Sequence, residues 1–375
     1  MSGLYVHIPF CKKACHYCNF HFSTQTKWIP PMIEAMTKEM ALRRAELPTH
    51  LKTIYFGGGT PSLLEVEHLQ QLLVTINELT SLSMDTEITI EVNPDDVTVE
   101  KILSWKELGI NRMSIGIQSF DNDLLTWMNR AHTAEQAKNS ILLARNNGIN
   151  NISIDLIYGI PGLELSSWEK QLYSIIELGI PHIACYALTV EPKTALETLI
   201  RNKKMEAPND DEQALQFYKM VEVLENAGYE HYEISNFALP GWRSQHNSSY
   251  WKGISYVGIG PSAHSFSEGR RKWNISNNAL YMNAIEKNDI FFEEEQLDIT
   301  KQVNEYLLTS IRTIEGTNLN LVKEKWGASA YLTIAKNAEK LVQQNLLISD
   351  DCYLRLSKNG KFLADKITVD LMLES

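Results

Sequence analysis

Short apolar runs rich in β-branched residues alternate with longer amphipathic stretches through the first half of the chain. The short runs predict strands over Leu4–Ile8, Thr53–Phe56, Glu87–Val92, Arg112–Ile117, Ser153–Ile157 and Ile183–Leu188. Apolar residues at helical spacing predict helices over roughly Pro31–Glu46, Glu65–Leu79, Val99–Leu108, Ala134–Asn147 and Ser167–Leu178. Strands that alternate with helices pair in parallel, so the pattern predicts an α/β fold, as a partial (β/α)6 barrel or a doubly wound sheet.

The polar residues at the predicted strand ends decide between these two architectures. Chemistry-bearing residue types follow nearly every strand, namely Cys11, Gly57–Gly59, Glu91, Gln118 and Asp155. In parallel α/β folds the carboxyl ends of the strands carry the functional groups. A doubly wound sheet uses mainly one crevice. Contributions from so many strands therefore favour the mouth of a partial (β/α)6 barrel.

The second half of the chain predicts a different organisation. A helix over Asp210–Tyr229 and a strand over Tyr229–Ser235 precede loops rich in aromatic residues and glycine. From Thr300 the pattern becomes helical, with a hairpin-like stretch over Leu346–Leu356. We therefore expect a barrel over residues 1–235, a connecting segment over 236–299 and a mainly helical, winged-helix-like extension over 300–375. A helical cap that packs on the barrel is the favoured interpretation of this extension.

The amino-acid composition limits which classes of binding partner and which cellular compartment we expect for this chain. The formal net charge is -11, whereas nucleic-acid binding needs clustered cations, so we expect no nucleic-acid partner. No run approaches the ~20 apolar residues of a membrane span, and the first ten residues lack the pattern of a signal peptide. Five cysteines, three of them crowded near the amino terminus, do not resemble a disulfide framework. These features predict a cytoplasmic protein without direct membrane insertion.

Residues 11–18 carry the most specific motif, CxxxCxxC, with its sulfurs on Cys11, Cys15 and Cys18. Three thiolates on a four-iron cluster leave one iron open, and an open iron can bind a chelate such as the amino and carboxylate groups of S-adenosylmethionine (SAM). The competing hypothesis is a structural zinc site, with His16 or His21 as the fourth ligand. His16 lies between two of the thiols, which makes that geometry awkward, so the motif favours a [4Fe–4S] cluster.

The two other cysteines lack ligand spacing. Cys185 lies in an apolar predicted strand and is expected to behave as a small hydrophobic residue. Cys352 lies far from the motif in sequence. We predict that both are dispensable for the cluster.

The sequence YVHIPFC over residues 5–11, together with the CxxxCxxC motif, resembles the radical SAM coproporphyrinogen oxidase family over nearly the whole chain. That family includes oxygen-independent coproporphyrinogen III oxidases and heme chaperones. The resemblance implies a cluster on the three cysteines and SAM at the barrel mouth. The family positions that contact SAM match Tyr5, Tyr17, Gly58, Gly59, Thr60, Glu91, Gln118, Arg130, Asp155 and, by backbone contact, Ala187.

Each of these residues has a plainer interpretation when taken alone. A glycine triplet is more often a simple turn than a ligand loop. The segment after Glu91 could cap the following helix, a role open to Asp95 and Asp96. A single Gln, Arg or Asp at a strand end is more often structural. Their match in order and spacing is what favours ligand contact.

Three features resemble the heme-chaperone branch of the family rather than the oxidases. Phe20 stands where the oxidases carry a further cysteine, and His264 closes a GIGPSAH segment where they carry an apolar residue. Residues 246–251 read HNSSYW, a motif that this branch associates with heme. His246 is therefore the predicted heme ligand, with Tyr250 and Trp251 as flat apolar surfaces for the macrocycle. The alternative is a hydrogen-bonded histidine in an aromatic-rich structural loop.

The resemblance implies a heme chaperone that binds heme and passes it to apo-proteins. The enzyme alternative is a coproporphyrinogen III oxidase, in which a 5'-deoxyadenosyl radical abstracts a propionate hydrogen and CO2 is lost to give protoporphyrinogen IX. A purely structural zinc protein is the third possibility.

Overall fold

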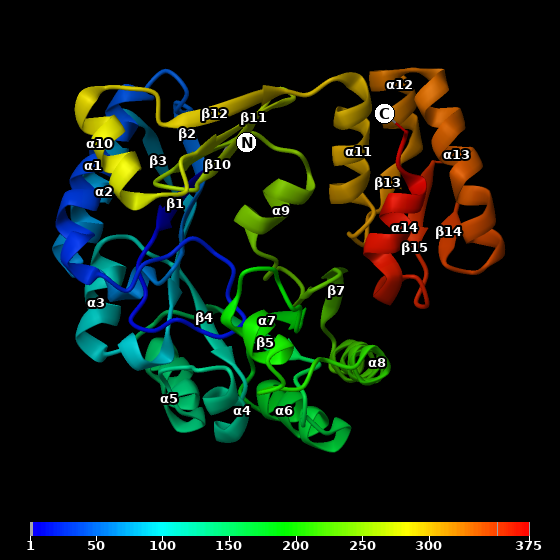
Figure 1. The fold of residues 1–375 in the computed structure, drawn as a ribbon, viewed down its shortest axis with the longest axis horizontal. Helices are drawn as coiled ribbons and strands as arrows, with labels where there is room; N and C mark the ends of the chain where they lie inside the picture. The colour runs from blue at the N-terminus through cyan, green and yellow to red at the C-terminus, as the bar shows by residue number, and fades with distance from the viewer. Residues whose placement is uncertain (1–2, 351, 375) are drawn as a thin grey trace.

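Six parallel strands in chain order form the centre of a curved mixed sheet. The computed structural model describes residues 3–350 and 352–374. The sheet has twelve strands in the order β12-β11-β10-β9-β1-β2-β3-β4-β5-β6-β8-β7 (Figure 1). Its parallel strands are β1 (Gly3–Ile8), β2 (His50–Gly58), β3 (Ser81–Val92), β4 (Arg112–Gln118), β5 (Asn151–Tyr158) and β6 (His182–Ala187). This arrangement confirms the predicted α/β partial barrel.

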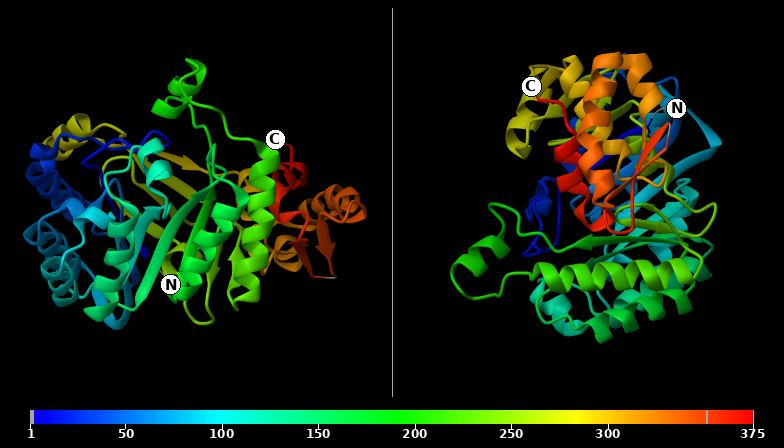
Figure 2. Two further views of the ribbon diagram at one scale, coloured as in Figure 1. Left: turned by 90° about the horizontal axis from the view of Figure 1, so that it is seen from below. Right: turned by 90° about the vertical axis from the view of Figure 1, so that its right-hand side faces the viewer.

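Each parallel strand is followed by at least one helix, and the helices stack along the outer side of the curved sheet (Figure 2). They are α1 (Ile29–Leu42), α2 (Val66–Leu79), α3 (Val99–Glu107), α4 (Asn122–Trp127), α5 (Ala134–Asn146), α6 (Leu165–Glu177) and α8 (Asp210–Asn226), whereas α7 (Ala195–Arg201) projects from the body of the molecule (Figure 2). Local chemistry sets their starts: a reciprocal capping box between Thr133 and Gln136 opens α5. Their inner faces bury Trp105 and Trp168 completely. None of the described helices is long and apolar enough to cross a lipid bilayer.

The segment predicted as loops after Asn236 instead extends the sheet at both edges. This segment contains β8 (Asn236–Ala238), α9 (Gln245–Trp251), β9 (Tyr256–Ile259), β10 (His264–Ser267), β11 (Arg270–Asn274), α10 (Asn278–Lys287) and β12 (Phe292–Gln296). β8 runs antiparallel to β6 and to β7 (Glu230–Glu233), while β9 pairs in parallel with β1. Strands this short are weakly periodic, so the sequence pattern does not reveal them. Phe237, Ile259 and Tyr281 from this segment are buried in the main core.

The carboxyl-terminal part has a core of its own, built on Val303, Leu307 and Ile334. Its elements are α11 (Ile299–Ser310), β13 (Thr317–Asn318), α12 (Leu319–Trp326), α13 (Ala328–Gln343), β14 (Leu347–Ser349), β15 (Tyr353–Leu356) and α14 (Ala364–Leu371). The small sheet has the order β13-β15-β14. This helix–strand–helix–helix–hairpin succession fits the predicted winged-helix-like extension. Asp351, inside the predicted hairpin, lies outside the described residues. The division into three parts at 236 and 300 stays a prediction.

A buried carboxylate joins α1 to the added strands and to α10. Glu39 accepts hydrogen bonds from Arg43 Nη1 at 2.8 Å, from the Gly260 amide at 2.8 Å and from Asn274 Nδ2 at 2.7 Å. The Tyr281 hydroxyl donates to the same carboxylate. Both charged side chains are almost completely buried, so each compensates the desolvation of the other. The pair therefore holds the β9–β11 extension against the barrel.

Replacing Glu39 with Ala is expected to lower the free energy of unfolding by about 3–5 kcal/mol, because it leaves Arg43 buried with only the half-exposed Glu46 as an acidic partner. Glu34→Ala, on the exposed face of the same helix, is the matched control and should change stability by less than about 0.5 kcal/mol. Denaturant titration followed by circular dichroism measures both. Equal midpoints for the two variants would contradict the assignment.

Candidate functional site

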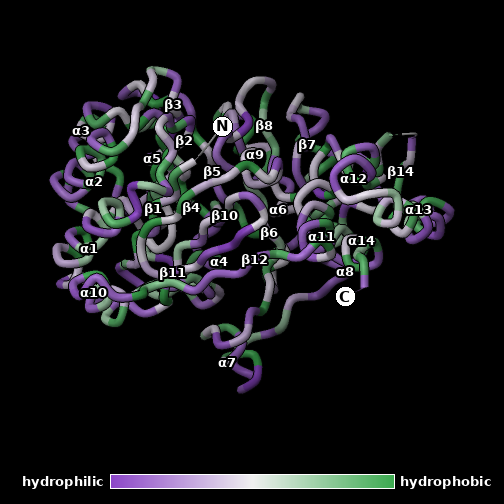
Figure 3. Tube along the Cα trace, turned by 90° about the horizontal axis from the view of Figure 1, so that it is seen from above, coloured by the Kyte–Doolittle hydropathy of each residue, from purple (hydrophilic) through white to green (hydrophobic). Residues whose placement is uncertain are grey.

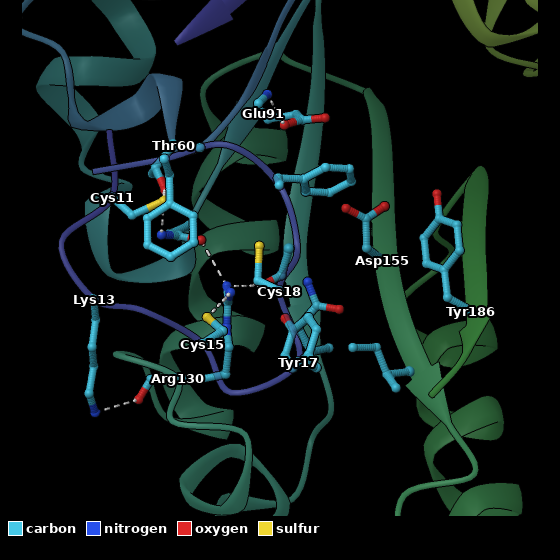
Figure 4. A pocket seen from close by; sticks show the side chains of 18 of the residues that line it. Cys11, Lys13, Cys15, Tyr17, Cys18, Thr60, Glu91, Arg130, Asp155 and Tyr186 are labelled. Carbon is cyan, nitrogen blue, oxygen red and sulfur yellow. Dashed lines mark hydrogen bonds between the residues drawn. The ribbon is translucent and has the colours of Figure 1, made fainter. Parts of the chain in front are cut away.

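The carboxyl ends of the parallel strands surround a cavity of about 360 Å³ (Figure 4). The structure brings together at this cavity nearly all of the residues predicted from the sequence: Cys11, Cys15, Tyr17, Cys18, Gly58, Gly59, Thr60, Glu91, Gln118, Arg130, Asp155 and Ala187. Only Tyr5 and His246 of the predicted set are not among its lining residues. Residues from all six strand ends thus meet at one opening.

The cysteine loop after β1 has no regular structure and is held by the connection between α4 and α5. The His16 amide donates to the Met128 carbonyl at 3.1 Å, and Asn129 Nδ2 donates to the Ala14 carbonyl at 2.6 Å. On the other side, Lys12 forms ion pairs with Asp95 and Asp96. The capping role considered for these two aspartates is wrong, because the side chain of Thr98 caps α3 instead.

Polar hydrogens surround the sulfur atoms. Arg130 Nη1 lies 3.3 Å from Cys15 Sγ, and the Thr60 hydroxyl donates to Cys11 Sγ at 3.5 Å (Figure 4). Asn93 connects these two donors, since it accepts from Arg130 Nη2 at 2.8 Å and donates to Thr60 at 3.3 Å. Hydrogen bonds to sulfur are one of the means by which proteins tune iron–sulfur clusters.

The arrangement fits a cubane cluster better than a single zinc ion. All three motif cysteines are free thiols that line the cavity. In a cubane each thiolate binds a different iron, so the sulfurs need not converge on one point. His16 Nδ1 donates to the Trp127 carbonyl at 2.8 Å and His21 Nε2 to Asn278 Oδ1 at 2.7 Å. Each histidine considered as a fourth zinc ligand has one ring nitrogen in a hydrogen bond, and neither lines the cavity that the three thiols share.

The glycine triplet after β2 allows the chain to approach β1 closely. Gly58 has a φ of +108°, and a Cβ there would lie 2.5 Å from the ring of His7. A Cβ on Gly59 would lie 2.6 Å from the Phe10 carbonyl oxygen. The Gly58 amide is free to point inward and donates to Glu91 at 3.1 Å. The close approach of the backbone therefore requires glycine at these two positions, in addition to the predicted ligand contact.

Two carboxyl groups face the cavity from neighbouring parts of the barrel. Burial first, and the nearby Asp155 second, raise the pKa of Glu91 to about 7, against the opposing effect of the Tyr55 hydroxyl, which donates to this carboxyl at 2.8 Å. Burial likewise raises the pKa of Asp155 to about 6, against the opposing effect of Arg112. Both groups therefore change charge within the range in which enzymes and binding proteins work.

The sequence analysis missed several residues at the same opening. Tyr186, Asn93 and Ser114 also line the cavity. Tyr186 directly precedes Ala187 at the end of β6, so its place at a strand end is the signal that could have found it. The connection that carries α7 projects from the body of the molecule (Figures 2 and 3), and its Leu196 amide donates to the His16 carbonyl at 2.7 Å.

Tyr5 and His246 lie deeper in the barrel, away from the cysteine loop. The Tyr5 ring stacks on Tyr55. His246 is 1% exposed, and its ring nitrogens bond the Thr53 hydroxyl and the Tyr250 hydroxyl, each at 2.7 Å. Thr53 pairs with the first residue of β1, so His246 lies at the amino ends of the strands. Burial lowers the pKa of His246 to about 3. Its role as a heme ligand stays a prediction.

Comparison with known proteins places the chain in a family. Residues 5–172 match the Radical SAM superfamily. The heme chaperone HemW of Bacillus subtilis is 33% identical over 371 residues, which cover 98% of each chain, and HemW of Lactococcus lactis is 33% identical over 374 residues, which cover 100% of this chain and 98% of the relative. The chain belongs to the HemW family of radical SAM proteins. Membership of the superfamily implies a [4Fe–4S] cluster and SAM.

A solved structure agrees with this HemW-family chain in fold. Coproporphyrinogen III oxidase (HemN) from Escherichia coli superposes with a TM-score of 0.86, covering 99% of this chain and 90% of that one. The sequences are 21% identical, so the likeness establishes the fold alone. It agrees with the α/β radical SAM fold predicted from the sequence.

We predict that Ala at Cys11, Cys15 or Cys18 abolishes assembly of an intact cluster, because each thiolate is expected to hold one iron. Iron and acid-labile sulfide, measured after anaerobic reconstitution, report the result. Cys185→Ala and Cys352→Ala are the matched controls, since neither cysteine lines the cavity, and they should retain the wild-type content. A Cys15→Ala protein with full iron and sulfide would overturn the assignment.

The two carboxyl groups predict a pH dependence of SAM binding. Protonated acids with pKa values near 6 and 7 ionise as the pH rises, and an ionised carboxylate accepts stronger hydrogen bonds from ribose or ammonium donors. SAM affinity of the reconstituted protein, measured by calorimetry, should therefore increase several-fold between about pH 5.5 and 8. Glu91→Gln should reduce this increase, and Glu107→Gln on the exposed face of α3 should not. A flat wild-type profile would contradict the prediction.

Proposed function

We propose that this chain is a cytoplasmic heme chaperone, which binds heme and delivers it to apo-proteins. The observation that carries the proposal is the similarity to proteins named heme chaperone HemW along 98% of both chains, at an identity of 33%. Relatives with that name also occur in Escherichia coli, at 36% identity over 277 residues that cover 72% of this chain and 71% of the relative. The branch features Phe20, His264 and the HNSSYW motif support the same conclusion.

In this proposal Cys11, Cys15 and Cys18 would hold the cluster at the cavity of the strand ends, and its fourth iron would be available to bind SAM. When bound, the cluster supplies the electron that cleaves SAM in this superfamily. Thr60 and Arg130 donate hydrogen bonds to sulfur, while the inward Gly58 amide keeps Glu91 oriented. Of the predicted SAM contacts, the residues that line the cavity are Tyr17, Gly58, Gly59, Thr60, Glu91, Gln118, Arg130, Asp155 and Ala187, while Tyr5 does not line it.

The second candidate function is oxygen-independent coproporphyrinogen III oxidation. The fold likeness to the Escherichia coli oxidase is the observation that favours it. Because that likeness rests on 21% identity, it carries the fold and not the activity. The chain also departs from the oxidase pattern at Phe20 and His264. We therefore place the oxidase second.

Two measurements on anaerobically reconstituted protein distinguish these functions. We expect a Soret band to develop on titration with heme, saturating at a fixed stoichiometry, and we expect transfer of that heme to an added apo-cytochrome. With SAM, reductant and coproporphyrinogen III, we expect no protoporphyrinogen IX. Turnover of coproporphyrinogen III in the absence of heme binding would replace the chaperone with the oxidase.

A further inference from the structure

A second cavity, of about 670 Å³, lies away from the cysteine loop. Its lining residues come from the β9–β11 part of the sheet on one side and from α11 and α12 of the carboxyl-terminal unit on the other. Its volume is within the range of about 300–1,000 Å³ typical of sites for small ligands and cofactors. The first cavity holds the residues predicted for the cluster and nearly all of those predicted for SAM, and none of these residues lines the second.

Aromatic side chains line this second cavity on two sides, beside polar residues that include Glu268 and Glu305. Tyr250 and Tyr256 meet edge to face with ring centroids 4.6 Å apart on the sheet side. Tyr306 and Trp326 lie 5.4 Å apart on the helical side, and Phe266 adds a further ring. Flat apolar surfaces on two opposing sides suit a planar macrocycle.

The cavity also has a histidine that is available to a metal. His264, the first residue of β10, lines the cavity and is exposed. Its ring stacks beside Trp273 and forms no hydrogen bond with the described residues. Partial enclosure lowers the pKa of His264, and Arg271 lowers it further, so the imidazole is neutral at pH 7 and keeps a lone pair. His246, in contrast, has both ring nitrogens bonded and is buried.

Cations at the rim match the two propionates of a heme. Lys252 and Lys325 line the cavity and are exposed, and neither takes part in an ion pair among the described residues. Arg271 is less available, because it pairs with Glu305 at 2.6 Å. A lone lysine on a surface is unremarkable, but here two lysines without an ion pair among the described residues, one of them with its ammonium 4.7 Å from the centroid of the Trp326 ring, lie beside an aromatic cavity with an accessible imidazole.

We propose that the cavity between β9–β11 and the α11–α12 helices is the heme site, with His264 as the axial ligand and with Lys252 and Lys325 facing the propionates. The proposal rests on the proposed heme-chaperone function and deepens it. His264 coordinates the iron through a ring-nitrogen lone pair, with no change in oxidation state. In this arrangement the HNSSYW motif positions a wall of the site and does not ligate the metal. The buried His246 is hydrogen-bonded to the hydroxyl of Tyr250, and Tyr250 lines the cavity.

The test is heme titration of the full-length, cluster-loaded protein, followed by absorption and magnetic circular dichroism. His264→Ala should weaken heme binding at least tenfold and shift the Soret band. His264→Gly with added imidazole should recover the wild-type band, a response that a purely structural role would not produce. His50→Ala removes an exposed histidine that does not line the cavity and should leave binding unchanged. Lys252→Glu with Lys325→Glu should weaken binding while leaving the axial-ligand spectrum unchanged.

The outcomes separate the site from the function. If wild-type protein binds heme, and His264→Ala retains both the wild-type spectrum and affinity, the site is wrong while the chaperone function stands. Loss of the histidine-ligated spectrum in His246→Ala alone would likewise assign the ligand to the buried residue. If wild-type protein binds no heme, the proposed function itself fails. The circular dichroism melting curve of His264→Ala should match wild type, since the side chain is exposed.

Discussion

The guanidinium of Arg130 joins three parts of the strand-end site that are far apart in sequence. It approaches the sulfur of Cys15 on the loop after β1, the amide of Asn93 after β3 and the Gly116 carbonyl of β4. A loop without regular structure has little intrinsic reason to keep three thiols in one geometry. The charged side chain of Arg130 contacts all three partners and so helps to fix the loop. The position of the cysteines therefore depends on the α4–α5 connection, which carries Arg130.

The parallel arrangement of the strands explains why site residues could be found from the sequence. Parallel strands bring their carboxyl ends to one edge, so a polar residue after each apolar run is placed near the others without any knowledge of side-chain contacts. Glu91, Gln118 and Asp155 follow this rule, and their match to the family in order and spacing is what marked them as ligand contacts. Helix starts were nearly as clear, because a capping residue such as Thr133 marks the first turn. The end of α1 was less clear: the helix ends at Leu42, and Arg43 after it donates to the Gly258 carbonyl of β9, a contact with a segment distant in sequence.

What could not be predicted depends on contacts between distant segments. The strands after Asn236 contain three to five residues each, and their pairing with β6 and β1 rather than their own periodicity makes them strands. The environment of His246 has the same origin. Its motif suggested an accessible ligand, whereas Thr53 from β2 and Glu87 from β3 fix the histidine inside the barrel. A sequence motif shows which residue types occur together, but not which of them faces a cavity.

The separation of the two cavities gives the carboxyl-terminal unit a physical role. A winged-helix-like arrangement presents several helices, and here α11 and α12 contribute Tyr306 and Trp326 to one wall of the second cavity. The opposite wall belongs to strands whose attachment to the barrel depends on the buried Glu39 network. A ligand held there is in contact with both units at once. None of the residues that line the strand-end cavity lines this one, so such a ligand lies apart from the cysteine loop.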